Sequence, residues 1–289
     1  MKLILSILTT GSVLLAVGCA PVGPDYARPE LQPSAHYKNT TSSALGVSPS
    51  WWRSFRDPQL NQLQSQLLAQ NLDLKAALAR RQQAFARLGI TAADLFPQAK
   101  GSGIAERKKD SRNNLSGSGM RQYYDQYQIG ANLSYEIDLW GRVRRLVEAG
   151  KADAQAADYA VADVRVALQT QLARQYFALR FLDAEMATLE GAIKTRQENV
   201  KITDDRFNAG LTSELDTTKA KAELANVRAE LMSLKGTRAQ LENSIAVLLG
   251  KQASQFRKSA RNYNGYLPSF PAGVPSGLLY RRPDVAVAE

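Results

Sequence analysis

The sequence is poor in the residues from which most catalytic and metal sites are built. Its 289 residues include one cysteine, Cys19, and one histidine, His36. A disulfide within the chain is therefore impossible, and a zinc site would lack ligands. A Ser-His-Asp or Cys-His device would depend on His36 alone, which lies among Pro, Ser and Thr residues typical of a linker. We therefore predict that the chain is not an enzyme and has no cofactor, no catalytic residues and no metal site.

Acidic residues are outnumbered, with 27 Asp and Glu against 37 Lys and Arg and a net charge of +10. Such a balance is compatible with nucleic acid or an anionic surface as a partner. The basic residues are spread out or form short clusters such as Arg142, Arg144 and Arg145, without the interleaved aromatics that bind single strands. We interpret them as a solvated basic surface and expect no nucleic-acid partner.

Long hydrophobic runs are absent beyond the first residues. Lys2 is followed by an apolar stretch from Leu3 to Val17 and then by Gly18 and Cys19. The stretch is too short and too poor in large apolar residues for a spanning helix, so it predicts a secretory signal peptide over residues 1–18. The alternative for Cys19 is a chance cysteine beside an ordinary signal.

Residues 15–19, Leu-Ala-Val-Gly-Cys, resemble a bacterial lipobox, in which the cysteine becomes the lipidated first residue of the mature chain. The sequence departs from that pattern at Ala16, where a larger aliphatic residue is usual. The resemblance implies a fatty acid such as palmitate on Cys19, and Ala20 in place of an aspartate favours the outer membrane. Residues 19–56, rich in Pro, Ser, Thr and Gly, are then expected to form a lipidated, extended tether.

Helical periodicity begins at Asp57. The apolar positions that recur at helical spacing are Leu60, Leu63, Leu67, Leu74 and Leu78. They predict helices over residues 57–96, with a break at Asn71 and an end before Pro97.

Residues 97–140 have the period of β-structure. Small residues at 99, 101, 103 and 105 alternate weakly with other types, and a polar, glycine-bearing loop follows over 108–119. From 127 to 139 apolar and polar or small residues alternate strictly, which predicts a strand with one apolar and one polar face. At ~3.3 Å per residue it spans roughly 40 Å, enough to cross a bilayer when tilted. A strand of a soluble sandwich is the alternative, although such strands are usually shorter.

The alternation divides the predicted strand into two sets of side chains. The predicted lipid-facing residues are Tyr127, Ile129, Leu133, Tyr135 and Ile137. Leu133 is expected near the middle of the strand. We interpret Glu136 and Asp138 as pore-facing or strand-end carboxylates rather than an acid–base pair. Trp140 is either an aromatic of the membrane interface or a packing residue.

A helical hairpin is predicted over residues 141–251. Heptad spacing up to about Phe207 predicts a helix ~100 Å long at 1.5 Å per residue. Gly210 suits a left-handed helix cap, and Ser213 to Asp216 fits a capping box for a second helix that ends near Gly250. Only Arg238 interrupts the apolar seam of that second helix. A β-hairpin is thus followed in the sequence by a long coiled coil. This order fits a membrane barrel that is continued by a helical conduit.

These segments together resemble the TolC family of outer-membrane efflux proteins, in the NodT-type lipoprotein branch that serves tripartite, RND-type systems. The most specific matches are Tyr-Glu-Ile-Asp-Leu-Trp-Gly-Arg at 135–142 and Leu-Leu-Tyr-Arg-Arg-Pro-Asp at 278–284. Further matches are Cys19 with Val-Gly-Pro-Asp-Tyr at 22–26, Trp51 with Trp52, and Arg206 with Gly210, Leu215 and Asp216. The resemblance, which runs from Cys19 to Glu289, implies a mainly α fold. The implied fold contains a long antiparallel helical hairpin, which is part of a coiled-coil barrel. It also contains a transmembrane β-hairpin over 97–140 with an extracellular loop, which supplies two strands of a trimeric outer-membrane β-barrel.

The resemblance also implies a function without chemistry. The expected protein is the lipid-anchored outer-membrane channel of a multidrug or metabolite efflux pump, a passive exit duct that extends into the periplasm. Its implied partners are two further copies, a periplasmic adaptor, an inner-membrane pump and the lipid membrane. The residues expected to contact the adaptor at the hairpin tip are Arg206, Gly210, Leu211, Thr212 and Asp216. The alternative for these residues is a stabilising helix cap and nothing more.

Two other functions compete with the channel. One is a periplasmic adaptor lipoprotein of an efflux system, although adaptors flank their helical hairpin with compact β domains. The other is a soluble, basic coiled coil that binds nucleic acid, which the secretion signal opposes.

In family members the Arg-Arg-Pro-Asp motif, here at 281–284, opens a second repeat of strands and helices. Residues 252–289 are therefore expected to be a linker and the start of that repeat, so that the sequence covers about half a subunit. Two strands per copy would leave barrel edges unpaired in lipid, so we expect that residues 1–289 alone do not form a conducting trimer. The family's gate residues lie largely in the second repeat, and we assign none.

Overall fold

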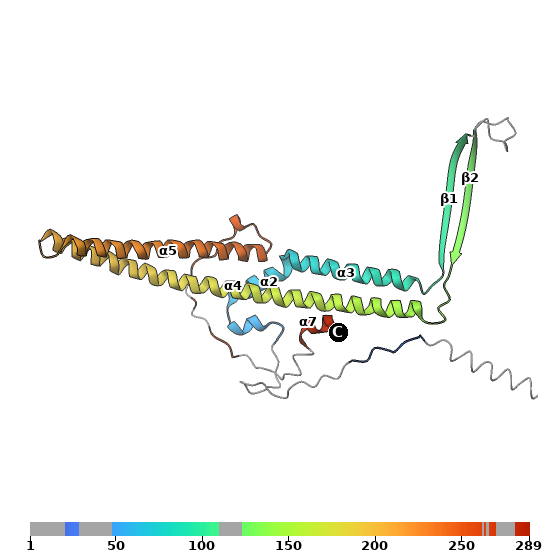
Figure 1. The fold of residues 1–289 in the computed structure, drawn as a ribbon, viewed down its shortest axis with the longest axis horizontal. Coiled ribbons are helices and arrows are strands. Elements are labelled where there is room, and N and C mark those ends of the chain that lie inside the picture. Colours follow the sequence, from blue (N-terminus) through green and yellow to red (C-terminus); the bar gives the residue numbers. More distant parts are fainter. Residues whose placement is uncertain (1–20, 29–47, 110–122, 262, 264–265, 270–280) are drawn as a thin grey trace, which may run out of the picture. The chain divides into compact units, whose positions relative to one another are not determined.

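The computed structural model describes residues 21–28, 48–109, 123–261, 263, 266–269 and 281–289 (Figure 1). The predicted signal peptide, Cys19, His36, residues 110–122 of the predicted loop and residues 278–280 of the second motif lie outside the described residues. The chain divides into two compact units, one of residues 1–30 with 81–157 and one of residues 31–80 with 158–289.

The described chain is mainly helical. Its long helices are α2 (Pro58–Gln70), α3 (Leu72–Ala93), α4 (Arg142–Asn208) and α5 (Glu214–Leu248), and its short ones are η1 (Trp51–Phe55), η2 (Ala253–Gln255) and α7 (Pro283–Ala288). Strands β1 (Gln98–Lys109) and β2 (Tyr123–Ser134) form a two-stranded antiparallel sheet. A long helical hairpin combined with a β-hairpin is the fold class that the sequence predicts. Among the described helices, none combines the length and the apolarity that crossing a membrane requires.

Asp57 starts helix α2 with its side chain. Its Oδ1 accepts hydrogen bonds from the N–H groups of Gln59 at 2.8 Å and Leu60 at 3.2 Å. Pro58 follows as the first helical residue, where a missing N–H is harmless because that group has no partner inside the helix.

Asn71 makes the break between two helices that the sequence predicts at this residue. Its Oδ1 accepts from the N–H of Leu74 at 2.8 Å and so caps α3, which ends before Pro97 as expected. Its Nδ2 donates to the carbonyl of Leu248 at 2.8 Å, in the last turn of α5. One buried amide therefore satisfies backbone groups at the ends of two helices that would otherwise lack partners.

The core of the second unit combines side chains from α2, α4 and the end of α5. Its most deeply buried members, each at most 1% exposed, are Leu60, Leu63, Leu67, Leu172, Tyr176, Leu179, Ile245, Ala246 and Leu249. The predicted helical leucines at 60, 63, 67 and 74 are thus core residues, whereas Leu78 is 39% exposed.

Strand β2 differs from the predicted strand at both ends. It runs from Tyr123 to Ser134, whereas the alternation predicted residues 127–139. Ser134 pairs with Gln98, the first residue of β1, and Pro97 before it has no N–H to continue the ladder. The prediction that Tyr135 and Ile137 lie in the strand is therefore wrong. Leu133, expected near mid-strand, is the second-last residue of β2.

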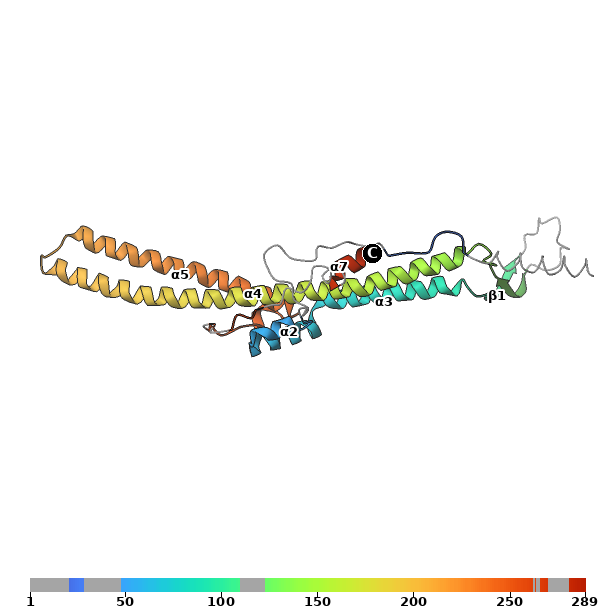
Figure 2. The same ribbon diagram turned by 90° about the horizontal axis from the view of Figure 1, so that it is seen from below.

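Helices α4 and α5 form the predicted antiparallel pair and lie side by side in both views (Figures 1 and 2). The 67 residues of α4 give a length of about 100 Å at 1.5 Å per residue. Ion pairs Arg196–Glu223 at 2.7 Å and Lys221–Asp204 at 2.9 Å connect the two helices. Because these pairs are exposed, they contribute little to stability.

Candidate functional site

The β-hairpin has one apolar face, and the register shows how it is built. Residue pairs on this face join a small residue of β1 to a residue of β2: Ala99–Leu133, Gly101–Ala131, Gly103–Ile129 and Ala105–Tyr127. The large side chains are open to the surroundings, with Ile129 94% and Tyr127 77% exposed. The opposite face pairs Lys100 with Asn132 and Glu106 with Gln126, so apart from Ile104 and Tyr124 it is polar or small.

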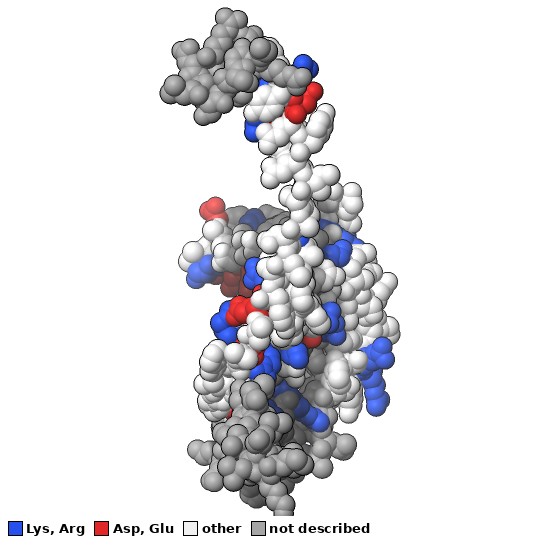
Figure 3. Space-filling view, turned by 90° about the vertical axis from the view of Figure 1, so that its right-hand side faces the viewer, with Lys and Arg blue, Asp and Glu red and all other residues white. Residues whose placement is uncertain are grey.

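Charge and aromatic residues bound the apolar face at its two ends. At the loop end the ion pair Arg107–Asp125, 3.6 Å long, follows the last apolar pair, and Figure 3 shows charged side chains gathered there. Exposed aromatics flank the face, with Tyr123 beside the loop and Phe96 and Tyr135 beyond the other end. From Ala99 to Ala105 the face extends roughly 20 Å at ~3.3 Å per residue, close to the ~25 Å apolar band of membrane barrels, which is also flanked by aromatics.

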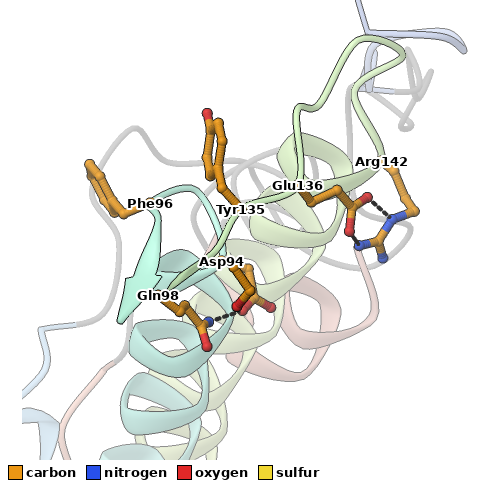
Figure 4. Close-up of a pocket in the computed structure, with 7 residues that line it drawn as sticks. Asp94, Phe96, Gln98, Tyr135, Glu136 and Arg142 are labelled. Atoms are coloured by element: carbon orange, nitrogen blue, oxygen red, sulfur yellow. Dashed lines mark hydrogen bonds and ion pairs between the residues drawn. The ribbon is translucent and has the colours of Figure 1, made fainter. Parts of the chain in front are cut away.

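The connection from β2 to α4 is tied to the first turn of the helix. Both carboxylate oxygens of Glu136 accept hydrogen bonds from the guanidinium of Arg142, with Nε 2.7 Å from Oε1 (Figure 4). The hydrogen bond from Arg142 holds the pKa of Glu136 below its usual value. Figure 4 also shows Gln98 beside Asp94, to whose Oδ1 its Nε2 donates at 2.7 Å, in an open pocket at this junction that Phe96 and Tyr135 also line.

Asp138 caps the start of α4 with its Oδ2, which accepts the N–H of Arg144 at 2.9 Å. Burial raises the pKa of Asp138, but the backbone hydrogen bonds from Arg144 and Val143 outweigh it and leave that pKa below its usual value. Glu136, Asp138 and Asp94 thus each have a partner and serve the fold, which disfavours an acid–base pair. No group of three or more His, Cys, Asp or Glu in the described part of the chain could hold a metal ion.

The turn between α4 and α5 has the cap that the sequence predicts. Gly210 has a φ of 72°, and the N–H of Leu211 donates to the carbonyl of Arg206 at 2.8 Å, as in a Schellman motif. A capping box joins Ser213 and Asp216, and Thr212 also donates to Asp216 at 2.7 Å. These hydrogen bonds, the one from Thr212 foremost, hold the pKa of Asp216 below its usual value. Leu211 is 77% exposed, so the turn presents an apolar side chain between polar ones.

A buried ionic cluster escaped the sequence prediction. Asp183, 3% exposed, forms an ion pair with Nη1 of Arg180 at 3.0 Å and accepts a hydrogen bond from Nε of Arg238 at 2.7 Å. The two arginines also donate to the carbonyls of Ser259 at 3.1 Å and Lys258 at 2.6 Å, which fixes the chain after α5 against both helices. The interruption of the seam at Arg238 was the one visible signal, since a charge in an apolar seam requires a buried partner.

Comparison with known proteins gives the class. A family model described as "Outer membrane efflux protein" matches residues 63–251. The chain belongs to this family of outer membrane efflux proteins. The match favours the channel over the adaptor and the nucleic-acid-binding coiled coil.

Individual relatives agree with the family. The chain is 31% identical over 297 residues to the "Probable efflux pump outer membrane protein TtgC" of Pseudomonas putida, across 100% of this chain and 60% of that protein. It is 26% identical over 292 residues to the "Probable outer membrane lipoprotein SilC" of Salmonella typhimurium, across 99% of this chain and 62% of that one. The solved Campylobacter jejuni CmeC outer membrane channel has a TM-score of 0.77 and 27% identity, across 93% of this chain and 59% of that structure. The chain thus spans about 60% of the length of these relatives.

Proposed function

We propose that this chain supplies part of the wall of an outer-membrane channel through which an efflux pump expels drugs or other small molecules. The observation that carries the proposal is the hairpin of β1 and β2, whose exposed apolar face is bounded by aromatics and charge and which leads directly into α4. A soluble hairpin with Ile129 94% exposed would place a large apolar side chain in water at a cost, whereas lipid accommodates it. Transport is passive on this proposal, because a channel wall contributes no chemistry.

The proposed membrane arrangement follows from the two faces. The side of the hairpin that carries Ile129 and Leu133 meets lipid, and the side that carries Lys100 and Asn132 meets the water of the pore. An isolated hairpin has unpaired outer edges, which are costly in lipid. Closure of the barrel therefore needs further strands, and we assign these to a homotrimer of the whole protein.

The helical pair of α4 and α5 is proposed to be the periplasmic part of the duct. Its tip, from Arg206 to Asp216, is the proposed contact with a periplasmic adaptor that joins the channel to an inner-membrane pump. Support for the contact comes from Leu211, which is 77% exposed in a turn where Thr212 and Ser213 are already hydrogen-bonded to Asp216. An exposed apolar side chain at such a position favours a protein contact.

Lipidation of Cys19 is proposed as the membrane anchor of the chain. It is supported by the lipobox-like sequence at 15–19 and by the similarity to SilC, whose name describes an outer membrane lipoprotein. Metabolic labelling with a fatty acid should mark the wild-type protein and not the variant Cys19→Ser. Equal labelling of both proteins would refute the anchor.

The decisive test of membrane crossing compares the two ends of the hairpin. Tyr123→Cys lies at the loop end and Gln98→Cys at the helix end, and a lipidated Cys19 has no free thiol to compete. A membrane-impermeant maleimide added to intact cells should label Tyr123→Cys only, and permeabilised cells should show both labelled. Labelling of both or neither in intact cells would overturn the proposed crossing.

A further inference from the structure

The segment that follows Cys19 is held against the start of α4, and the site described above does not use it. Residues 21–28 contain the sequence Val-Gly-Pro-Asp-Tyr at 22–26. The N–H of Val22 donates to the carbonyl of Trp140 at 3.0 Å, which joins the segment to the connection between β2 and α4. This single backbone link brings together residues that are far apart in the sequence.

Arg145, in the first turn of α4, supplies most of the remaining contacts. Its Nη2 donates to the carbonyl of Gly23 at 2.8 Å, its Nε to the carbonyl of Val22 at 3.4 Å, and its Nη1 to Asp25 at 2.9 Å. Glu148, one turn further along α4, accepts from the same Nη1 at 2.6 Å and orients the guanidinium. A planar guanidinium spreads its donors over three nitrogens and so reaches two carbonyls and a carboxylate at separate positions, whereas the donors of a lysine all lie on one nitrogen.

Gly141 makes room for the segment. A Cβ at this position would lie 2.5 Å from both Cα and Cβ of Pro21, closer than any real contact, and its φ of 82° is one that other residues rarely adopt. The need for glycine therefore comes both from the backbone conformation and from the close approach of the N-terminal segment.

The three neighbouring arginines at the start of α4 therefore pair with different parts of the chain. Arg142 and Arg144 pair with the carboxylates of the preceding connection, Glu136 and Asp138, whereas Arg145 turns to the N-terminal segment. Each of the three guanidinium groups therefore has a carboxylate partner, while the side chain of Arg142 remains 61% exposed.

We infer that Arg145 and Gly141 form a clamp that positions the lipid anchor at the junction of strand and helix. Cys19 lies two residues before Pro21, and two residues of extended chain reach at most about 7 Å. A fatty acid on Cys19 therefore enters the membrane beside the connection that leaves β2, which the proposed function places at the periplasmic surface of the outer membrane. The binding partner of the anchored segment is therefore the lipid membrane. The role of the clamp rests on the proposed lipidation, but its contacts do not.

The test joins the segment to the junction by a cross-link. Val22 and Trp140 are 67% and 70% exposed, so their substitution by cysteine disturbs no core, and their backbones are hydrogen-bonded, which brings the Cα atoms into disulfide range. In the whole chain with Cys19→Ser, where these are the only two thiols, oxidation should link Val22→Cys to Trp140→Cys. Adding Arg145→Ala or Gly141→Ala should abolish most of this product, and Arg145→Lys should restore little of it.

Matched variants separate the clamp from a general loss of structure. Arg196→Ala removes another arginine of α4 with one ion pair, and Gly236→Ala adds a methyl group where no atom lies within 4 Å, so both should leave the yield unchanged. Helix content by circular dichroism should be the same throughout. No cross-link in the parent, or an undiminished cross-link in Arg145→Ala, would overturn the clamp. Absence of fatty-acid labelling on Cys19 of the wild-type protein, with the Cys19→Ser parent still cross-linking, would refute the anchor and the clamp's positioning role, while the docking itself stands.

Discussion

The hydrogen bond from Tyr176 to Asp57 allows a stability prediction worked out from the structure. Tyr176 is fully buried in α4, and its hydroxyl donates to Oδ2 of Asp57 at 2.6 Å, while Oδ1 of the same carboxylate caps α2. Burial and the bond to Asp57 both raise the pKa of Tyr176, so it remains a donor throughout the physiological range. Tyr176→Phe keeps the ring in the core and removes only this donor. A hydrogen bond to a charged group contributes about 1.5–3 kcal/mol, and Asp57, 5% exposed, has little access to water as a substitute.

We therefore expect Tyr176→Phe to lower the free energy of unfolding by about 1.5–3 kcal/mol. The measurement is urea unfolding in detergent, followed by circular dichroism of the helices, with the slope checked to be unchanged. Tyr159→Phe is the matched control, since Tyr159 is 47% exposed on the same helix and its change should stay within about 0.5 kcal/mol. If the two variants lost the same stability, the reasoning about the buried carboxylate would be refuted.

Three further predictions concern the hairpin and the tip. Ile129→Arg, near the middle of the apolar face, should lower the free energy of unfolding in lipid vesicles by about 2–4 kcal/mol, as measured by urea titration. Leu133→Arg, near the end of that face, should lower it less, and Gln128→Arg on the other face should have a small effect. A larger loss of stability in Gln128→Arg than in Ile129→Arg would mean that the faces are reversed. The pKa of Asp216 is lower in the folded protein than its value of about 3.9 in the unfolded chain. Asp216 therefore stabilises the start of α5 at a pH above about 3.9, and this stabilisation is lost as the pH falls through the pKa of the folded state. Protection of the nearby amides from hydrogen exchange, corrected for the intrinsic rate, should therefore fall in acid in the wild type and should already be low at neutral pH in Asp216→Asn. Thr212→Cys should cross-link to the adaptor and Thr237→Cys, on the exposed middle of α5, should not; an intact complex with no product from Thr212→Cys would contradict the tip contact.

Local rules predicted the helical part of the fold well, because the signals lie within a few residues of the features they specify. Asn71 marks the break between α2 and α3, Gly210 has the left-handed conformation, and Asp216 closes the capping box. Each of these depends on backbone groups within one turn of the residue, which the sequence displays directly.

Features set by distant parts of the chain were missed or misplaced. The alternation continues to Leu139, but strand β2 ends at Ser134 because pairing stops where β1 begins, after Pro97. The partner of Arg238 is Asp183 on another helix, and that of Arg145 is the segment behind Cys19. Periodicity in one segment carries no information about which other segment it meets.

The two faces of β2 offer the most direct test of the central claim that this hairpin is part of a channel wall. Single cysteines placed in turn from Tyr127 to Leu133 would be treated in outer membranes with a water-soluble, impermeant maleimide. The account predicts labelling with a period of two, strong at Gln128, Gly130 and Asn132 and weak at Tyr127, Ile129 and Leu133. Uniform labelling along the strand, as for a hairpin in water, or the inverse pattern would contradict it.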